Sequence, residues 1–281
     1  DTAALLPQDR WVLHQFNELT KEVTENLEKF ELGIALQKVY DFIWEEFCDW
    51  YIEMVKPRLW NKEDSTREAA LWTLREVLSR ALKLLHPFMP FITEEVFLSL
   101  NEEDSIMVSS WPVEEARFVF PEDAAEVERV KDAVREIRRI RTSMNVAPGQ
   151  QAEVFVVSED EAVLDSFRRA EDFFRVLGRA SEVKLQKDKT GIREDAVSAV
   201  IPGAMIYIPF ADLVDVEKEK ERLAKEEARL ESEIARADGM LRNEKFLAKA
   251  PADKVAAEQE KRKKYEEMLE KVREQRKMLG A

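Results

Sequence analysis

The sequence predicts a mainly α protein that consists of an antiparallel helical bundle, a small α+β module and a C-terminal antiparallel two-helix coiled-coil hairpin. Three observations lead to this prediction. Apolar side chains recur at intervals of three and four residues over most of the chain. Alternation with a period of two is confined to short runs between residues 151 and 211. From residue 212 onward, only two glycines and one proline interrupt a highly charged helical pattern.

Length and composition narrow the class of protein. A chain of 281 residues with 45% hydrophobic side chains can bury a core and is long for one helical domain. Its single cysteine, Cys48, excludes a disulfide scaffold and a cysteine-cluster zinc site, and it favours the reducing cytoplasm. The chain has no unbroken apolar run long enough to span a membrane, so we expect no membrane partner.

The charge of the chain is unevenly distributed. A net charge of −14 argues against a generally basic surface that binds nucleic acid. Residues 212–281 hold 18 acidic and 18 basic side chains, so the excess negative charge comes from the preceding residues. Any surface that binds nucleic acid must therefore be a local stripe of cations on an acidic background.

Apolar residues at helical spacing predict the first two helices of the bundle. The first helix covers residues 9–30, with Asp9 as its N-cap. The second covers residues 34–55 and ends at Pro57, because proline cannot donate the hydrogen bond that a helix interior requires. Residues 58–65 are then expected to form a loop.

Two prolines predict a tight corner after the third helix. This helix covers residues 66–86 and ends before Pro87, since a proline disfavours helical geometry in the residue that precedes it. Pro90 suits the start of a short fourth helix, residues 91–100, because the first turn of a helix needs no backbone donor. An extended connector follows at residues 101–111.

The remaining elements follow from changes in periodicity. A fifth helix, residues 122–144, turns valines and isoleucines toward the core, and Pro148-Gly149 ends the bundle. The hairpin arms that begin near residue 212 are each about 28 residues long, or ~42 Å. Between bundle and hairpin, one helix and four short strands are predicted at residues 159–177 and at residues 152–157, 183–186, 196–201 and 204–209.

The fifth helix carries the most suggestive charge pattern. Its cationic side chains point away from the valine and isoleucine stripe: Lys131, Arg135, Arg138 and Arg139, with Arg141 at the end of the helix. An ordinary solvated face is the interpretation that the residue types alone favour. The alternative is a phosphate-binding stripe, because guanidinium forks grip phosphate oxygens. Asn145 could contact a base edge, although asparagine in a turn is more often structural.

Other candidate contacts with nucleic acid are aromatic side chains and the cations of the hairpin. Trp72 and Trp11 lie off the core faces of their helices, so they could stack on unpaired bases or pack against neighbouring segments. The hairpin could be a nucleic-acid-binding arm or a coiled-coil scaffold. Its candidate residues are Lys225, Arg229, Arg236, Arg242, Lys245, Lys249, Lys261 and Arg262.

No catalytic site is predicted within the chain. The sequence has no paired acid and base at a useful spacing, no metal-ligand spacing and no glycine-rich phosphate loop. We therefore expect no catalytic residue, no metal and no cofactor in these 281 residues.

Four separated stretches resemble a known family. They are LHPFMPFITEEVF (residues 85–97), DRW (residues 9–11), DFIWEEFCDWYIEM (residues 41–54) and IRTSMNVAPG (residues 140–149). In this order, and followed by a charged hairpin, they resemble the C-terminal part of bacterial-type valyl-tRNA synthetases, which are class Ia enzymes. The resemblance implies a linker at residues 1–8, an anticodon-binding bundle at 9–150, an α+β module at 151–211 and a tRNA-binding arm at 212–281.

The resemblance also implies a function and partners. The bundle would receive the anticodon stem-loop of tRNA(Val), and the hairpin would contact the tRNA elbow. Members of the family attach valine to this tRNA with ATP and magnesium. Their HIGH and KMSKS signatures do not occur here, so we expect the chain to be inactive alone and to be preceded by catalytic and editing domains. A cytoplasmic monomer is expected.

Two alternatives remain open. One is the corresponding region of another aliphatic class Ia enzyme. Isoleucyl enzymes commonly end in a cysteine-rich zinc unit, which one cysteine cannot build, and leucyl enzymes lack the terminal hairpin. The other alternative is a coiled-coil scaffold with no role in RNA binding.

Overall fold

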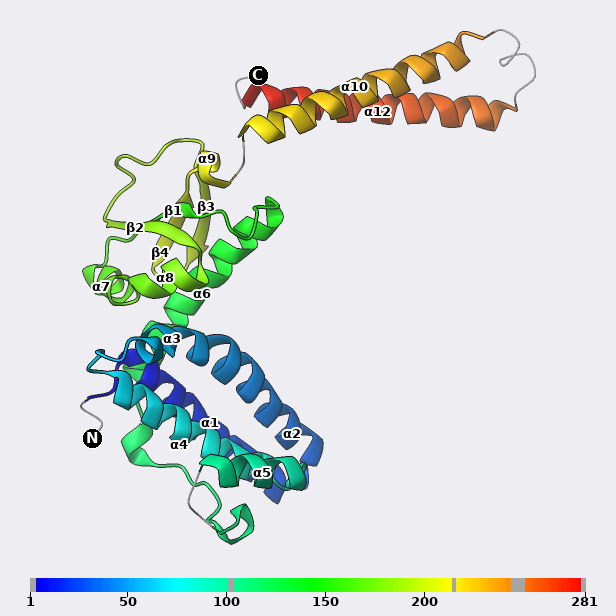
Figure 1. Ribbon diagram of the computed structural model, residues 1–281. Coiled ribbons are helices and arrows are strands. Elements are labelled where there is room, and N and C mark those ends of the chain that lie inside the picture. Colours follow the sequence, from blue (N-terminus) through cyan, green and yellow to red (C-terminus); the bar gives the residue numbers. More distant parts are fainter. Residues whose placement is uncertain (1–3, 101–103, 214–215, 244–250, 279–281) are drawn as a thin grey trace. The chain divides into compact units, whose positions relative to one another are not determined.

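The computed structural model describes residues 4–100, 104–213, 216–243 and 251–278 (Figure 1). The chain divides into two compact units. One comprises Asp1–Ile140 and Gln151–Tyr207, and the other comprises Arg141–Gln150 and Ile208–Ala281. The mainly α fold with a small sheet and a C-terminal pair of helices is confirmed. Among the described residues, no helix is both long and apolar enough to cross a membrane.

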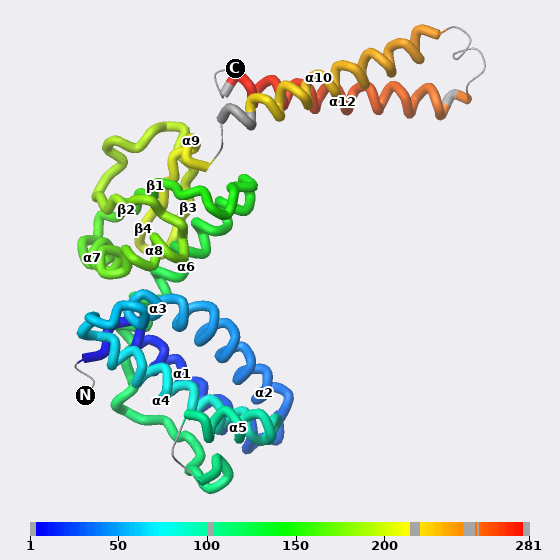
Figure 2. Tube along the Cα trace, viewed as in Figure 1, coloured from blue at the N-terminus to red at the C-terminus, as the bar shows by residue number. Residues whose placement is uncertain are grey.

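The bundle is built on α1, which packs against both α2 and α4 (Figure 2). Large side chains that are almost completely buried, such as Trp11, Phe16 and Phe97, form its core. Burial of such side chains is the main stabilising contribution to a fold of this type. The helices are α1 Pro7–Glu28, α2 Leu32–Asp41, α3 Glu53–Trp60, α4 Arg67–Leu85 and α5 Pro90–Leu100.

A π-helical segment, Phe42–Ile52, joins α2 to α3, so the helix predicted at residues 34–55 is continuous but has a π-helical middle. Such segments are rare and shift the faces that the following side chains present. Pro57 lies inside α3 rather than at its end, so that prediction was wrong. The helix continues to Trp60 because the Pro57 carbonyl still accepts the N–H of Asn61, at 3.2 Å, although the ring cannot donate.

Asp9 is not the N-cap of α1, which is another correction. Leu6 occupies that position, and Asp9 accepts the Leu6 N–H from within the first turn, at 2.9 Å. Its carboxylate is fully buried and takes a two-point ion pair from Arg58, at 2.8 and 3.0 Å. The Tyr51 hydroxyl donates to the same carboxylate at 2.8 Å. Asp9 therefore joins α1 to the end of the second helical stretch.

The corner between α4 and α5 forms where the two prolines predict it. His86 Nδ1 lies 2.7 Å from the Thr93 hydroxyl, and this contact spans the corner. Leu82, Phe97 and Ile106 form a small core behind it. The connector predicted at residues 101–111 is less extended than expected, because it contains a short 3-10 turn at Ile106–Val108. A second 3-10 turn, Ala116–Phe118, follows it.

The α+β module contains a four-stranded sheet in the order β2-β1-β4-β3. Strands β1 and β2 are parallel and are joined by two helices, whereas β1 and β4 are antiparallel. The predicted helix at residues 159–177 is broken at Ala170, whose N–H donates to Phe167 O in a tighter turn. The elements are β1 Ala152–Val157, α7 Glu161–Arg169, α8 Glu171–Leu177, β2 Ala180–Gln186, β3 Val197–Ile201 and β4 Ala204–Ile208.

Helix α6, Pro121–Ser143, contacts both the bundle and the α+β module. On the bundle side, Lys131 reaches Glu46. On the module side, Arg169 forms a two-point ion pair with Glu126, at 2.9 and 2.6 Å, and the Arg138 Nε donates to Leu177 O at 2.9 Å. The valine and isoleucine stripe of α6 is buried as predicted.

The second unit contains α9 Phe210–Leu213 and the helical hairpin of α10 Val216–Leu241 and α12 Ala252–Met278. Leu223, Leu230 and Leu269 are buried along the seam, as the spacing predicts. Glu227, which interrupts the apolar seam, accepts the Arg273 Nε at 2.8 Å and also pairs with Arg276. These two arginines lower the pKa of the Glu227 carboxyl. The seam therefore includes an interhelical ion cluster.

Candidate nucleic-acid interface

The exposed cations of α6 are Arg135, Arg138 and Arg139. Arg139 pairs with Glu136 at 2.7 Å and keeps 64% of its side chain exposed; Arg135 pairs with Asp132 at 2.8 Å and keeps 46% exposed. Exposed pairs of this kind contribute little to stability, so a phosphate can compete for the arginines. These three residues form a local basic surface on an acidic chain.

The pKa values of these arginines differ in direction. Partial burial lowers the pKa of Arg138 from its usual range, while nearby Asp49 and Glu53 act in the opposite direction. The hydrogen bond to Glu136 raises the pKa of Arg139. Arginine titrates so far above neutral pH that both groups keep their charge.

Lys131 does not share this exposed face, so that prediction was wrong. The side chain is fully buried, and its ammonium group lies 2.5 Å from Glu46 Oε2 and 2.7 Å from Glu128 Oε1. Lys131 follows Val127 by four residues and precedes Val134 by three, which places it on the apolar stripe of the helix. In this fold Lys131 is a core residue and offers no contact with a nucleic acid.

Trp11 is also buried, contrary to the expectation that it lies off the core face. Its indole Nε1 donates to Glu128 Oε1 at 2.9 Å, and the Lys131 ammonium lies 4.5 Å from the centroid of its ring. Glu128 and Lys131 of α6 contact this indole, and the periodicity within α1 could not reveal those contacts.

Arg141 and Asn145 shape the loop that follows α6. Arg141 is buried and donates to the carbonyls of Ala147, at 3.2 Å, and Gln150, at 2.7 Å. Asn145 is exposed and has a φ of 53°, a left-handed conformation that asparagine adopts more readily than most residues. Its N–H donates to Thr142 O at 3.1 Å. This geometry supports the structural interpretation of Asn145. The burial of Arg141 contradicts the prediction that it belongs to an exposed cationic face.

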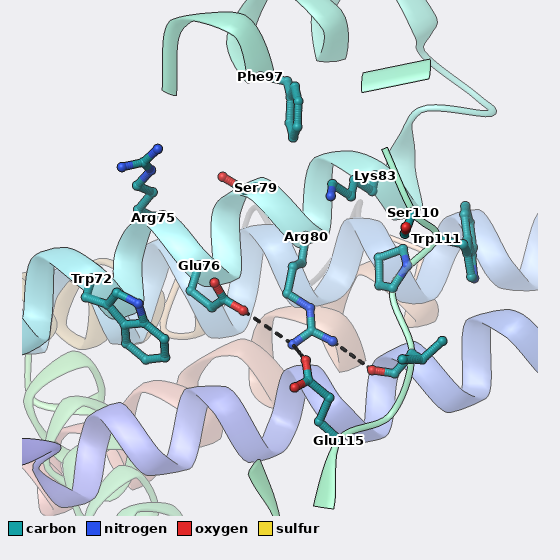
Figure 3. A pocket seen from close by; sticks show the side chains of 12 residues that line it. Trp72, Arg75, Glu76, Ser79, Arg80, Lys83, Phe97, Ser110, Trp111 and Glu115 are labelled. Carbon is teal, nitrogen blue, oxygen red and sulfur yellow. Dashed lines mark hydrogen bonds and ion pairs between the residues drawn. The ribbon is translucent and has the colours of Figure 1, made fainter. Parts of the chain in front are cut away.

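A cavity of about 480 Å³ lies along α4 and the connector that leads to α6. Trp72, 41% exposed, lies toward one end of the lining and Trp111 toward the other (Figure 3). The Trp72 ring packs on Phe118, with 6.3 Å between ring centroids. The full lining is Trp72, Arg75, Glu76, Ser79, Arg80, Lys83, Phe97, Ser110, Trp111, Pro112, Val113 and Glu115.

Some of the charged side chains that line this cavity already have partners within the protein. Arg80 pairs with Glu115 at 2.7 Å, donates to Val113 O at 2.7 Å and lies 5.4 Å from the ring centroid of Phe16. Arg80 therefore holds the connector against α4. Trp72 is partly exposed beside this ion-paired connector, so an unpaired base could stack on the accessible part of its ring.

The hairpin candidates lie mostly on exposed faces. Ion pairs within α10 join Lys225 to Glu221, Arg229 to Glu226 and Arg236 to Glu233. Arg242 is exposed and Arg262 bridges to Asp238 of the other helix at 2.5 Å. The exposed Lys261 lies 5.7 Å from the ring centroid of Tyr265. Lys245 and Lys249 lie outside the described residues.

The sequence did not single out the partners of the buried lysine. These partners are Glu46 and Glu128, and both carboxylates accept from the Lys131 ammonium. The available signal was the position of Lys131 on an apolar stripe, since a buried ammonium requires carboxylate partners. Over the part of the chain that the structure describes, no group of histidine, cysteine, aspartate and glutamate side chains is arranged to hold a metal ion.

Comparison with known proteins agrees with this organisation. Residues 9–156 match the family described as the anticodon-binding domain of tRNA ligase, and residues 215–280 match the valyl-tRNA synthetase tRNA-binding arm. The chain is 45% identical to a valine–tRNA ligase of Clostridium acetobutylicum over 267 residues, which cover 95% of this chain and 30% of that protein. It is 47% identical to that of Clostridium tetani over 272 residues, which cover 96% and 31%.

The chain spans about 30% of the length of these curated relatives. A more distant valine–tRNA ligase, from Bacillus anthracis, is 36% identical over 267 residues. The match to the anticodon-binding domain covers more than half of the chain and includes the bundle, α6 and nearly all of β1. The chain therefore belongs to the anticodon-binding domain family of tRNA ligases, and it carries the tRNA-binding arm of valyl-tRNA synthetases at its C-terminal end.

Proposed function

We propose that this chain is the tRNA-binding C-terminal region of a valine–tRNA ligase, in which the bundle holds the anticodon stem-loop of tRNA(Val) and the hairpin contacts the elbow of the tRNA. The observation that carries the proposal is the presence, in one chain and in this order, of an anticodon-binding match and a valyl tRNA-binding-arm match. Relatives that are called valine–tRNA ligases match over 95% of the chain.

The whole protein would join valine to tRNA(Val) with ATP and magnesium, in a cytoplasmic monomer. The catalytic and editing domains would be other parts of the same polypeptide, because the relatives are about three times as long as this chain. Within the chain, residues 9–150 would be the anticodon-binding domain, 151–211 a small module and 212–281 the arm. These 281 residues would bind tRNA without catalysing its aminoacylation.

The contribution of this region to catalysis would be positional. Binding the anticodon end rigidly, far from the reacting atoms, orients the acceptor end and lowers the entropy lost in the chemical step. Contacts from arginines to phosphate set the register of the RNA and carry no sequence information. Arg135, Arg138 and Arg139 of α6 are suited to that role because they are exposed guanidinium groups on a single helix.

The test is the salt dependence of tRNA binding. We expect Arg135→Glu/Arg139→Glu to weaken the affinity for all tRNAs similarly and to reduce the slope of log K against log salt by about 0.7–0.9 for each lost phosphate contact. Fluorescence anisotropy with labelled tRNA at several salt concentrations measures both quantities. Arg138 is left unchanged because its Nε holds the Leu177 carbonyl.

A matched control is Arg168→Glu/Arg175→Glu on α7 and α8, where both arginines are exposed and paired with carboxylates on their own helix. This control should bind tRNA as the wild type does. Undetectable binding by the wild type, or an affinity that does not change with salt, would favour a coiled-coil scaffold instead. An equal loss in both double variants would argue against a binding role that is specific to α6.

A further inference from the structure

Three cationic side chains of α6 surround one indole ring. The guanidinium carbons of Arg135 and Arg138 each lie 5.3 Å from the centroid of Trp50, and the Lys131 ammonium lies 5.5 Å from it. Trp50 belongs to the π-helical segment Phe42–Ile52 and is buried. An aromatic face attracts cations at this range, so the ring provides a common surface for all three groups.

Through Lys131, the Trp50 ring contacts a buried polar network that joins three segments. Lys131 pairs with Glu46 of the π-helical segment and with Glu128 of α6. The Trp11 Nε1 of α1 donates to the same Glu128 carboxylate. A buried, fully paired charge of this kind adds little net stability, but it restricts the geometry of the groups that it joins. The indole under Arg135 and Arg138 is therefore enclosed by buried, paired groups.

This arrangement restricts two arginines that would otherwise be mobile. A long side chain on a solvated helix loses up to about 2 kcal/mol of rotamer entropy when it is ordered. Contact with the Trp50 ring reduces this freedom of Arg135 and Arg138 before any ligand binds. The Arg138 Nε is already bonded to Leu177 O, so its terminal nitrogens are the donors that remain to bind a phosphate.

We propose that Trp50 is a positioning residue for RNA: it holds Arg135 and Arg138 side by side as a pre-ordered receptor for the sugar-phosphate backbone. The inference rests on the proposed function and specifies how the basic surface works. A preorganised pair binds more tightly than two freely rotating arginines because less conformational entropy is lost on association. Trp50 acts through the arginines and does not contact the RNA.

A double-mutant cycle tests this role. With the 281-residue chain and labelled tRNA, we expect Trp50→Leu to weaken binding roughly tenfold, as does Arg135→Gln/Arg138→Gln. Both changes should reduce the salt slope by about 1.4–1.8, which corresponds to two lost phosphate contacts. Trp50→Phe retains an aromatic face and should bind within about twofold of the wild type. Trp50→Leu added to the arginine variant should cause no further loss.

The outcomes separate the inference from the proposed function. Additive losses in the combined variant, or unchanged binding by a folded Trp50→Leu protein, would overturn the role of Trp50 and leave tRNA binding intact. Failure of the wild type to bind tRNA would overturn both. Should Trp50→Leu not fold, NMR of the wild type decides: stacking predicts ring-current shifts of the Arg135 and Arg138 side-chain protons, and ordinary shifts would refute it.

Discussion

At the scale of single residues, the charge type of a side chain does not reveal whether it lies on the surface. Lys131, Arg58 and Arg80 are all buried and paired with carboxylates, whereas Arg135 and Arg139 are exposed. The distinction decides function, because only an exposed cation can exchange its partner for a phosphate. Lys131 pairs with two carboxylates inside the protein, whereas Arg139 is exposed and can bind a ligand.

Trp72 is the residue from which we expect discrimination between tRNAs. Trp72→Ala should weaken binding only of tRNAs with the cognate anticodon loop, since a base stack on an aromatic ring contributes about 1–3 kcal/mol. Affinities for cognate and non-cognate tRNAs, measured side by side, check this. Trp60→Ala is the control, because Trp60 is 75% exposed at the end of α3 and does not line the cavity. Equal losses for every tRNA would count against stacking.

The raised pKa of the buried Tyr51 hydroxyl predicts how the stability of the fold responds to alkaline pH. Burial, and then the charge of Asp9 that accepts its hydrogen bond, raise the pKa of the Tyr51 hydroxyl well above its usual range. The folded state therefore retains a proton that the unfolded state loses, and the free energy of unfolding should fall as pH rises above about 10. Below that pH, Tyr51 makes its full contribution to the free energy of unfolding.

The measurement is urea denaturation from pH 8 to 11. Tyr51→Phe should show a shallower alkaline decline and, at neutral pH, lose about 1 kcal/mol with the hydrogen bond to Asp9. Tyr40→Phe is the matched control because Tyr40 is 57% exposed, and it should decline as the wild type does. Identical alkaline slopes for Tyr51→Phe and wild type would refute the assignment.

At the scale of elements, the hairpin depends on a narrow seam. Leu230 is fully buried between α10 and α12, so Leu230→Ala should destabilise the hairpin by about 2–5 kcal/mol through lost burial and a cavity. Hydrogen exchange of the α10 amides measures the local effect without requiring the whole chain to unfold in one step. Met240→Ala, at a position that is 37% exposed, should change exchange far less. Comparable effects would mean that the seam lies elsewhere.

Helix α6 carries polar groups with defined partners on two of its faces. On the side that faces the bundle, Lys131 donates to Glu46. On the side that faces the α+β module, Arg138 donates to Leu177 O. The π-helical segment that precedes α3 turns Trp50 toward this helix. Helical spacing predicted the length of α6, but the contacts that order its arginines come from segments more than thirty residues away.

At the scale of the whole molecule, the net charge of −14 limits non-specific attraction to nucleic acid. Binding must depend on a few ordered cations, and the described residues place such groups on α6 and along the hairpin. Each unit presents its own basic groups among its own acidic side chains. Affinity for tRNA should accordingly come from matched positions of phosphates rather than from total charge.

The sequence by itself determined the helical class, the proline corner at residues 87–90, the small sheet and the seam of the hairpin. These features depend on periodicity and on local backbone chemistry, which are properties of neighbouring residues. The family also followed from short local motifs, and comparison with known proteins confirms it.

Only the tertiary structure decided which candidate site residues can meet a ligand. Trp11 and Lys131 are buried because side chains of α1, α6 and the π-helical segment meet there, and Arg141 donates to loop carbonyls because the loop brings Ala147 and Gln150 back to the end of α6. The stacking of Arg135 and Arg138 on Trp50 joins residues that are 85 and 88 positions apart in the chain. Helical periodicity assigns a face to a side chain, but the segment that covers this face is set by long-range packing, which no local pattern encodes.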